Sequence, residues 1–116
     1  MEHRRRVPRV QTGEWPGRCS VEGDPESARV ECKLLDLSIF GAGIELPGGP
    51  YSDFQDQKVI VEVHAPLGES VSLRLVGEVR NMTPTSEGTR LGIEFVELSE
   101  TEQEILKVFS IMKAFW

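Results

Sequence analysis

Arginines gather at the N-terminus of an otherwise acidic chain. Arg4, Arg5, Arg6 and Arg9 lie close together, whereas the whole sequence has 13 Lys and Arg against 19 Asp and Glu and a net charge of -6. A planar guanidinium donates paired hydrogen bonds to the oxygens of anionic groups such as phosphate. Domains that bind nucleic acid usually spread basic charge over a whole face. The short arginine run therefore favours a small anion and argues against nucleic acid.

A second polar cluster lies in the stretch "DLSIFG", which places Asp36, Ser38 and Gly41 in a D-x-S-x-x-G pattern. By itself the pattern indicates only a strand that turns into a loop, because Asp and Ser bond nearby backbone and Gly permits a tight turn. On the pattern alone, this explanation by the fold is the stronger one.

The elements that would position these residues are predicted from hydrophobic periodicity. Alternation of apolar and polar residues predicts six short strands, at residues 18–23, 28–38, 42–46, 58–66, 70–82 and 90–98. Gly77 interrupts the fifth strand and suggests a bulge or a sharp bend. Ser99 and Glu102 form a capping box, after which apolar residues recur at helical spacing. The pattern predicts a small antiparallel β-barrel followed by a C-terminal helix.

The domain organisation expected from this pattern is a single unit of 116 residues. Residues 1–17 are expected to form a flexible arm, residues 18–98 the barrel and residues 99–116 the helix. No apolar stretch is long enough to span a membrane, so we expect no stable membrane insertion and a cytoplasmic protein.

Metal binding and catalysis have little support in the sequence. Cys19 and Cys32 belong to no CxxC pair, and His3 and His64 are too scattered to complete a ligand set. A hairpin around Pro25 would place the two cysteines opposite one another as half-buried, reduced thiols. There is no nucleophile–base set, so we expect neither a metal site nor an enzyme.

The two polar motifs together resemble the PilZ domain family. The R-x-x-x-R stretch is Arg5-Arg6-Val7-Pro8-Arg9, the D-x-S-x-x-G stretch follows it in the expected order, and "LGIEF" (residues 91–95) and "LSETEQEILKVF" (residues 98–109) resemble the family's late strand and helix. The resemblance implies a six-stranded antiparallel barrel and a bacterial receptor for the second messenger cyclic di-GMP, with no other cofactor. It implies ligand contacts from the arm and the barrel, at Arg4, Arg5, Arg9, Asp36, Ser38 and Gly41.

The resemblance also has implications for the number of ligand molecules bound per chain and for the way in which the signal is passed on. Arginine directly before R-x-x-x-R, here Arg4, is associated in the family with two mutually intercalated ligand molecules. The signal is expected to leave through an unidentified protein partner, for which Trp15 and the terminal "KAFW" (residues 113–116) are candidate anchors. Two alternatives stay open: an adaptor that binds no nucleotide and acts only through protein contacts, and an arm that binds anionic lipid.

Overall fold

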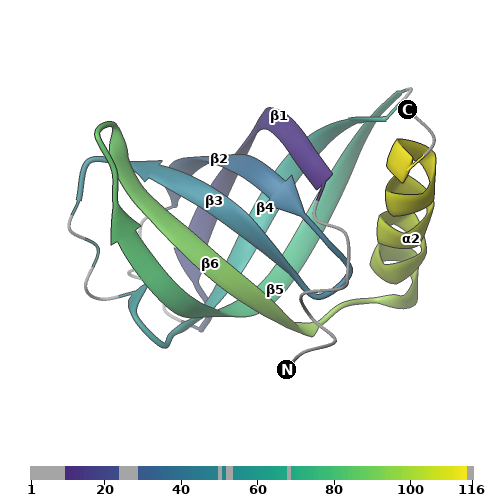
Figure 1. The fold of residues 1–116 in the computed structure, drawn as a ribbon. Coiled ribbons are helices and arrows are strands. Elements are labelled where there is room, and N and C mark those ends of the chain that lie inside the picture. Colours follow the sequence, from purple (N-terminus) through teal and green to yellow (C-terminus); the bar gives the residue numbers. More distant parts are fainter. Residues whose placement is uncertain (1–9, 24–28, 50, 52–53, 68, 115–116) are drawn as a thin grey trace.

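A closed barrel of six antiparallel strands forms the body of the molecule, with one helix beside it (Figure 1). The computed structural model describes residues 10–23, 29–49, 51, 54–67 and 69–114. The elements are β1 (Val10–Val21), β2 (Val30–Leu37), β3 (Gly41–Pro47), β4 (Lys58–Leu67), β5 (Glu69–Pro84), β6 (Gly88–Glu97) and α2 (Glu100–Ala114). The predicted antiparallel barrel with a C-terminal helix is confirmed.

The strands follow one another around the barrel in the order β1-β2-β3-β6-β5-β4. Hairpins connect β1 to β2, β2 to β3, β4 to β5 and β5 to β6. Two further pairings, of β1 with β4 and of β3 with β6, join the two halves and close the barrel. Because every strand has two neighbours, the sheet has no free edge.

The barrel starts earlier in the chain than the sequence predicted. β1 begins at Val10, so residues 10–17 belong to the barrel and not to the arm. Gly13 and Glu14 have φ values of 75° and 64°, and the pairing with β2 shifts between Gln11 and Trp15. This bulge lets a segment rich in Gly and Pro continue as a strand. Residues 1–9, which carry the arginines, lie outside the described residues.

Trp15 is part of the core, so the prediction that it anchors an interface is wrong. The bulge turns its side chain inward, where it is 7% exposed. Around it, the inward faces of the strands supply a continuous apolar core of Leu34, Leu37, Ile44, Leu46, Val59, Val61, Val63, Leu73, Leu75, Val79, Leu91 and Ile93. Residues 115 and 116 of the terminal "KAFW" lie outside the described residues.

The two cysteines are free and fully buried, not half-buried. They are not directly opposite: Cys32 pairs with Gly17, and Cys19 pairs with Val30. The register therefore differs by two residues from the predicted one, and the thiols are diagonal neighbours on the inner face. Burial, together with the proximity of Cys32, raises the pKa of Cys19 to about 12, and burial raises the pKa of Cys32 to about 12.

The helix begins with the predicted capping box. Ser99 Oγ accepts a hydrogen bond from the backbone N–H of Glu102 at 3.1 Å, and its hydroxyl also bonds the Glu102 carboxylate. Leu106 is buried against the barrel core, which fixes α2 to the barrel. Among the described residues, no helix is long and apolar enough to cross a bilayer.

Candidate ligand-binding site

The orientation of Asp36 is set by a bulge in β2. Leu34 pairs with Ile44 and Asp36 pairs with Gly43, so Leu35 is an extra residue without a partner on β3. Simple alternation would place Asp36 on the same inner face as Leu34. The bulge reverses this order: Leu37 turns inward, and Asp36 shares the outer face with Gly43.

Asp36 forms an ion pair with Arg90 across the strand that lies between them. The Nη2 atom of Arg90, on β6, lies 2.6 Å from Oδ2 of Asp36, on β2, so the two side chains meet above β3. Gly43 lies beneath them, and a Cβ atom there would come within 2.5 Å of Oδ2 and 3.2 Å of Nη2. The absence of a side chain at Gly43 is therefore what allows the pair to form.

The two members of this pair differ in exposure. The Asp36 side chain is 3% exposed, whereas that of Arg90 is 49% exposed. A buried carboxylate is costly unless it is paired and hydrogen-bonded, and the charge-assisted bond from Arg90 meets part of that requirement. The Asp36 carboxylate is therefore shielded from solvent, whereas about half of the Arg90 side chain is accessible.

Ser38 shapes the turn between β2 and β3. Its Oγ accepts hydrogen bonds from the backbone N–H groups of Phe40 at 3.1 Å and Gly41 at 3.2 Å. The Ser38 N–H in turn donates to the Gly41 carbonyl oxygen at 2.9 Å. These bonds occupy the Ser38 hydroxyl within the protein and give it a structural role of the kind that serines play in turns.

Gly41 is required by the fold, irrespective of any ligand. A Cβ at this position would lie 2.3 Å from the carbonyl oxygen of Ile93, because β3 and β6 approach closely there. The prediction that Gly41 contacts the ligand therefore has a competing structural explanation. Its neighbours Ile39 and Phe40 are exposed at the tip of the turn.

The arginine segment joins the barrel beside this turn. Val10 pairs with Leu37 and Gln11 pairs with Asp36, so the chain that carries Arg4, Arg5 and Arg9 enters β1 next to the D-x-S-x-x-G stretch. Arg4, Arg5 and Arg9 themselves lie outside the described residues. The structure therefore brings Asp36, Ser38 and Gly41 together and leaves the arginine contacts as predictions.

Two residues of this region were missed in the sequence: Arg90 and Gly43. Alternation along β6 places Arg90 on the outer face, between the buried Thr89 and Leu91. Nothing in the sequence indicates that β3 separates Arg90 from Asp36, because that neighbourhood depends on the pairing of β3 with both β2 and β6.

A surface groove among the described residues lies elsewhere on the barrel. It has a volume of about 670 Å³, crosses the outer face of β4, β1, β2 and β3, and contains none of the predicted site residues. Its lining combines three cations with four carboxylates, so it offers no excess of positive charge to an anion. The charged lining residues are Arg18, Arg29, Lys33, Glu31, Glu45, Glu62 and Glu87.

Metal coordination finds no support in the described part of the chain, where no three His, Cys, Asp or Glu side chains are grouped as a metal site. His64 is exposed, and its Nδ1 lies 3.3 Å from the Ser72 hydroxyl. This arrangement is an ordinary surface contact, and His3 lies outside the described residues.

Comparison with known families matches the PilZ domain to residues 3–111. The chain belongs to the PilZ domain family. A comparison with solved structures supports the same fold. The Bacillus subtilis inhibitor of motility (MotI/DgrA) aligns with a TM-score of 0.75 and 18% identity, over 94% of this chain and 50% of that one. This chain therefore spans about half the length of that relative.

Two structures of YcgR from Escherichia coli are also similar. Its PilZ domain with c-di-GMP aligns with a TM-score of 0.71 and 20% identity, over 94% of this chain and 90% of that one. YcgR in complex with c-di-GMP aligns with a TM-score of 0.68 and 21% identity, over 96% of this chain and 47% of that one. The comparison with curated proteins gave no match. These likenesses establish the fold of the PilZ domain.

Proposed function

We propose that this PilZ domain is a receptor for cyclic di-GMP. Arg5 and Arg9 bind phosphate and guanine acceptors from the segment before β1, and Asp36 accepts N–H groups of a guanine from the barrel side. Ser38 supports the turn that carries the site and is a further candidate contact. The protein does this without catalysis, as a cytoplasmic component of bacterial second-messenger signalling.

The observation that carries the proposal is the position of Asp36. A bulge turns its carboxylate to the outer face, and the pairing of Val10 with Leu37 attaches the arginine segment beside it. This entry point supports the proposal that the arginine donors and the Asp36 acceptor bind one ligand that carries both guanines and phosphates. The YcgR PilZ domain with c-di-GMP, which has the same fold, supports the choice of ligand.

The low exposure of Asp36 fits a receptor that rearranges on binding. A carboxylate that is 2% exposed becomes available only when the chain around it moves. Ordering the arginine segment around the ligand would cost conformational entropy and lower the affinity, but it would also create a changed surface for a protein partner to recognise. We propose this change as the signal.

Isothermal titration calorimetry with cyclic di-GMP tests the proposal. Arg5→Ala, Arg9→Ala and Asp36→Ala are each expected to weaken binding by about 1–3 kcal/mol, because each removes one good polar pair. Arg74→Ala is the matched control, since Arg74 is exposed on β5, away from the motif residues.

Two outcomes would contradict the proposal. Absence of binding by the wild-type protein would favour the alternative, an adaptor that acts only through protein contacts. Wild-type titrations from all three variants would show that the motifs do not form the site. If anionic vesicles bound the protein and Asp36→Ala left that binding unchanged, the arm would instead be a lipid-binding segment.

A further inference from the structure

Arg90 is an exposed guanidinium whose only described partner is the Asp36 carboxylate. Glu45 lies directly opposite Arg90 in the pairing of β3 with β6, yet its carboxylate accepts a hydrogen bond from Thr85 at 3.2 Å. Arg90 instead reaches across β3 to Asp36 through Nη2. A guanidinium has five N–H donors, so most of those on Arg90 have no partner among the described residues.

The pair places a hydrogen-bond donor beside two acceptors. The N–H groups of Arg90 adjoin Oδ2 of Asp36, and Oδ1 lies next to it on the same carboxylate. Guanine presents the complementary order on its pairing edge: the O6 acceptor, the N1–H donor and the N2 amino donor. Adenine presents a donor, its N6 amino group, where guanine has the O6 acceptor, and an acceptor at N1.

We infer that Arg90 is a specificity-determining residue that, together with Asp36, reads the pairing edge of guanine. This inference rests on the proposed binding of cyclic di-GMP and adds a contact outside both sequence motifs. Arg90 donates to O6 while Asp36 accepts from N1–H and the N2 amino group. Gly43 makes the arrangement possible, because any side chain there would separate the two groups.

Base discrimination is the quantity that tests this role. Cyclic di-GMP and cyclic di-AMP are titrated separately into the wild-type protein and Arg90→Gln. The variant is expected to bind cyclic di-GMP about 10- to 100-fold more weakly, as the loss of one specific base contact predicts. Its affinity for cyclic di-AMP should change by less than about threefold, because the lost donor faces a donor on adenine. The ratio of the two affinities therefore falls.

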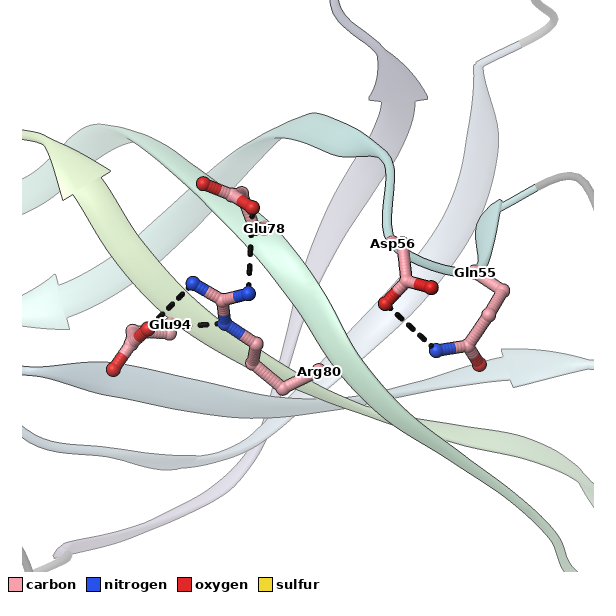
Figure 2. A network of polar contacts seen from close by, with 5 residues as sticks. All are labelled: Gln55, Asp56, Glu78, Arg80 and Glu94. Atoms are coloured by element: carbon pink, nitrogen blue, oxygen red, sulfur yellow. Dashed lines mark hydrogen bonds and ion pairs between the residues drawn. The ribbon is translucent and has the colours of Figure 1, made fainter. Parts of the chain in front are cut away.

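A matched control lies on the neighbouring strand. Arg80, on β5, is 47% exposed and donates to Glu94 from Nε at 3.0 Å and from Nη2 at 2.8 Å, with Glu78 at 3.4 Å (Figure 2). Arg80→Gln removes an exposed, paired arginine of the same barrel without touching Asp36. It should leave both affinities and their ratio unchanged.

Two further variants separate specificity from folding. Arg90→Lys keeps the charge but cannot hold Asp36 and present a second donor in the same plane, so its affinity ratio should be intermediate. Gly43→Ala keeps both charged groups but places a Cβ 2.5 Å from Oδ2, and it should lower the ratio by displacing the carboxylate. Circular dichroism establishes that each variant is folded.

The outcomes distinguish this inference from the proposed function. If the wild-type protein binds cyclic di-GMP and folded Arg90→Gln retains its affinity ratio, the inference is wrong and the proposed function stands. Equal weakening of both nucleotides would also overturn it, because that result would assign Arg90 a purely structural role. Absence of cyclic di-GMP binding by the wild-type protein would overturn both.

Discussion

Single residues in the D-x-S-x-x-G stretch have different roles that the motif does not distinguish. Asp36 presents a carboxylate to the outer face, Ser38 closes the turn with hydrogen bonds, and Gly41 allows β3 to approach β6. Of these three residues, Asp36 is the one whose side chain is not fully accounted for by its role in the fold. Loss of binding in a Gly41 variant would therefore not identify a ligand contact.

Replacement of Ser38 by Ala is expected to lower the free energy of unfolding by about 1–3 kcal/mol, because the buried N–H of Gly41 and the part-buried N–H of Phe40 lose their acceptor. Urea denaturation measures this change. Ser72→Ala is the control, since the Ser72 hydroxyl bonds an exposed histidine. Equal midpoints for Ser38→Ala and the wild-type protein would show that the turn does not depend on the hydroxyl.

The residues of the site were only partly predictable. Asp36 and Ser38 were predicted from the D-x-S-x-x-G spacing together with the resemblance to the PilZ domain family, neither of which requires knowledge of the structure. The outward direction of Asp36 was not predictable, because alternation with Val30, Cys32 and Leu34 points it inward and one extra residue, Leu35, reverses it. Arg90 was missed because three strands, β3, β4 and β5, lie between it and Asp36 in the order of the chain.

At the scale of elements, all six strands and the helix were predictable from periodicity, since each strand has an apolar inner face. The start of β1 was not. Gly13, Pro16 and Gly17 are typical of loops, and only pairing with β2 and β4 holds them in a strand. The register of the first hairpin was also wrong, because the residues between β1 and β2 do not fix it by sequence alone.

That register has a measurable consequence for the two thiols. Diagonal residues on paired strands are about 7–8 Å apart, which exceeds the Cα separation usual for a disulfide, so Cys19 and Cys32 should remain reduced. Their pKa of about 12 exceeds the pKa of about 8.5 expected for an unfolded thiol. As the pH rises through this interval, the unfolded chain loses protons first, and the free energy of unfolding falls.

The double variant Cys19→Ala, Cys32→Ala isolates this contribution. Urea denaturation between about pH 8.5 and pH 11 should show a shallower loss of stability than in the wild-type protein. Lysines titrate in the same interval but are common to both proteins, so they cancel in the comparison. Parallel profiles would contradict the assignment of raised thiol pKa values.

At the scale of the whole molecule, an acidic barrel carries a basic segment at one end. The net charge of -6 makes the chain a poor partner for extended polyanions, while the arginines precede β1, the strand that enters the barrel next to Asp36. Because positive charge is concentrated in the segment before β1 of an otherwise acidic chain, that segment favours the binding of a small anionic ligand. It also leads to an expectation about how many ligands bind.

We expect two molecules of cyclic di-GMP per chain, held in part by Arg4. Two stacked ligands bring additional phosphates together, and an extra guanidinium offsets that charge. Titration at protein concentrations well above the dissociation constant gives the equivalence point, and Arg4→Leu should move it from two towards one. Arg6→Leu is the control, because it removes an equal charge from the same segment.

One ligand per chain in both the wild-type protein and Arg4→Leu would show that Arg4 is a solvated residue that does not set the number of bound ligands. Binding should weaken as salt concentration rises, because exposed charges are screened over about 10 Å at an ionic strength of 0.1 M. This salt dependence should be steeper for the wild-type protein than for Arg4→Leu.

The way in which the barrel closes sets the order of its assembly. Four of its six pairings are hairpins between consecutive strands and can form locally, whereas β1 must find β4 and β3 must find β6 across long stretches of chain. Such distant pairings make folding slow, typically on the scale of milliseconds to seconds. The last pairings to form would then include that of β1 with β4, and β1 is the strand that follows the arginine segment. A newly made chain would thus acquire its arginine segment in working position only at the end of folding, when β1 seals the barrel.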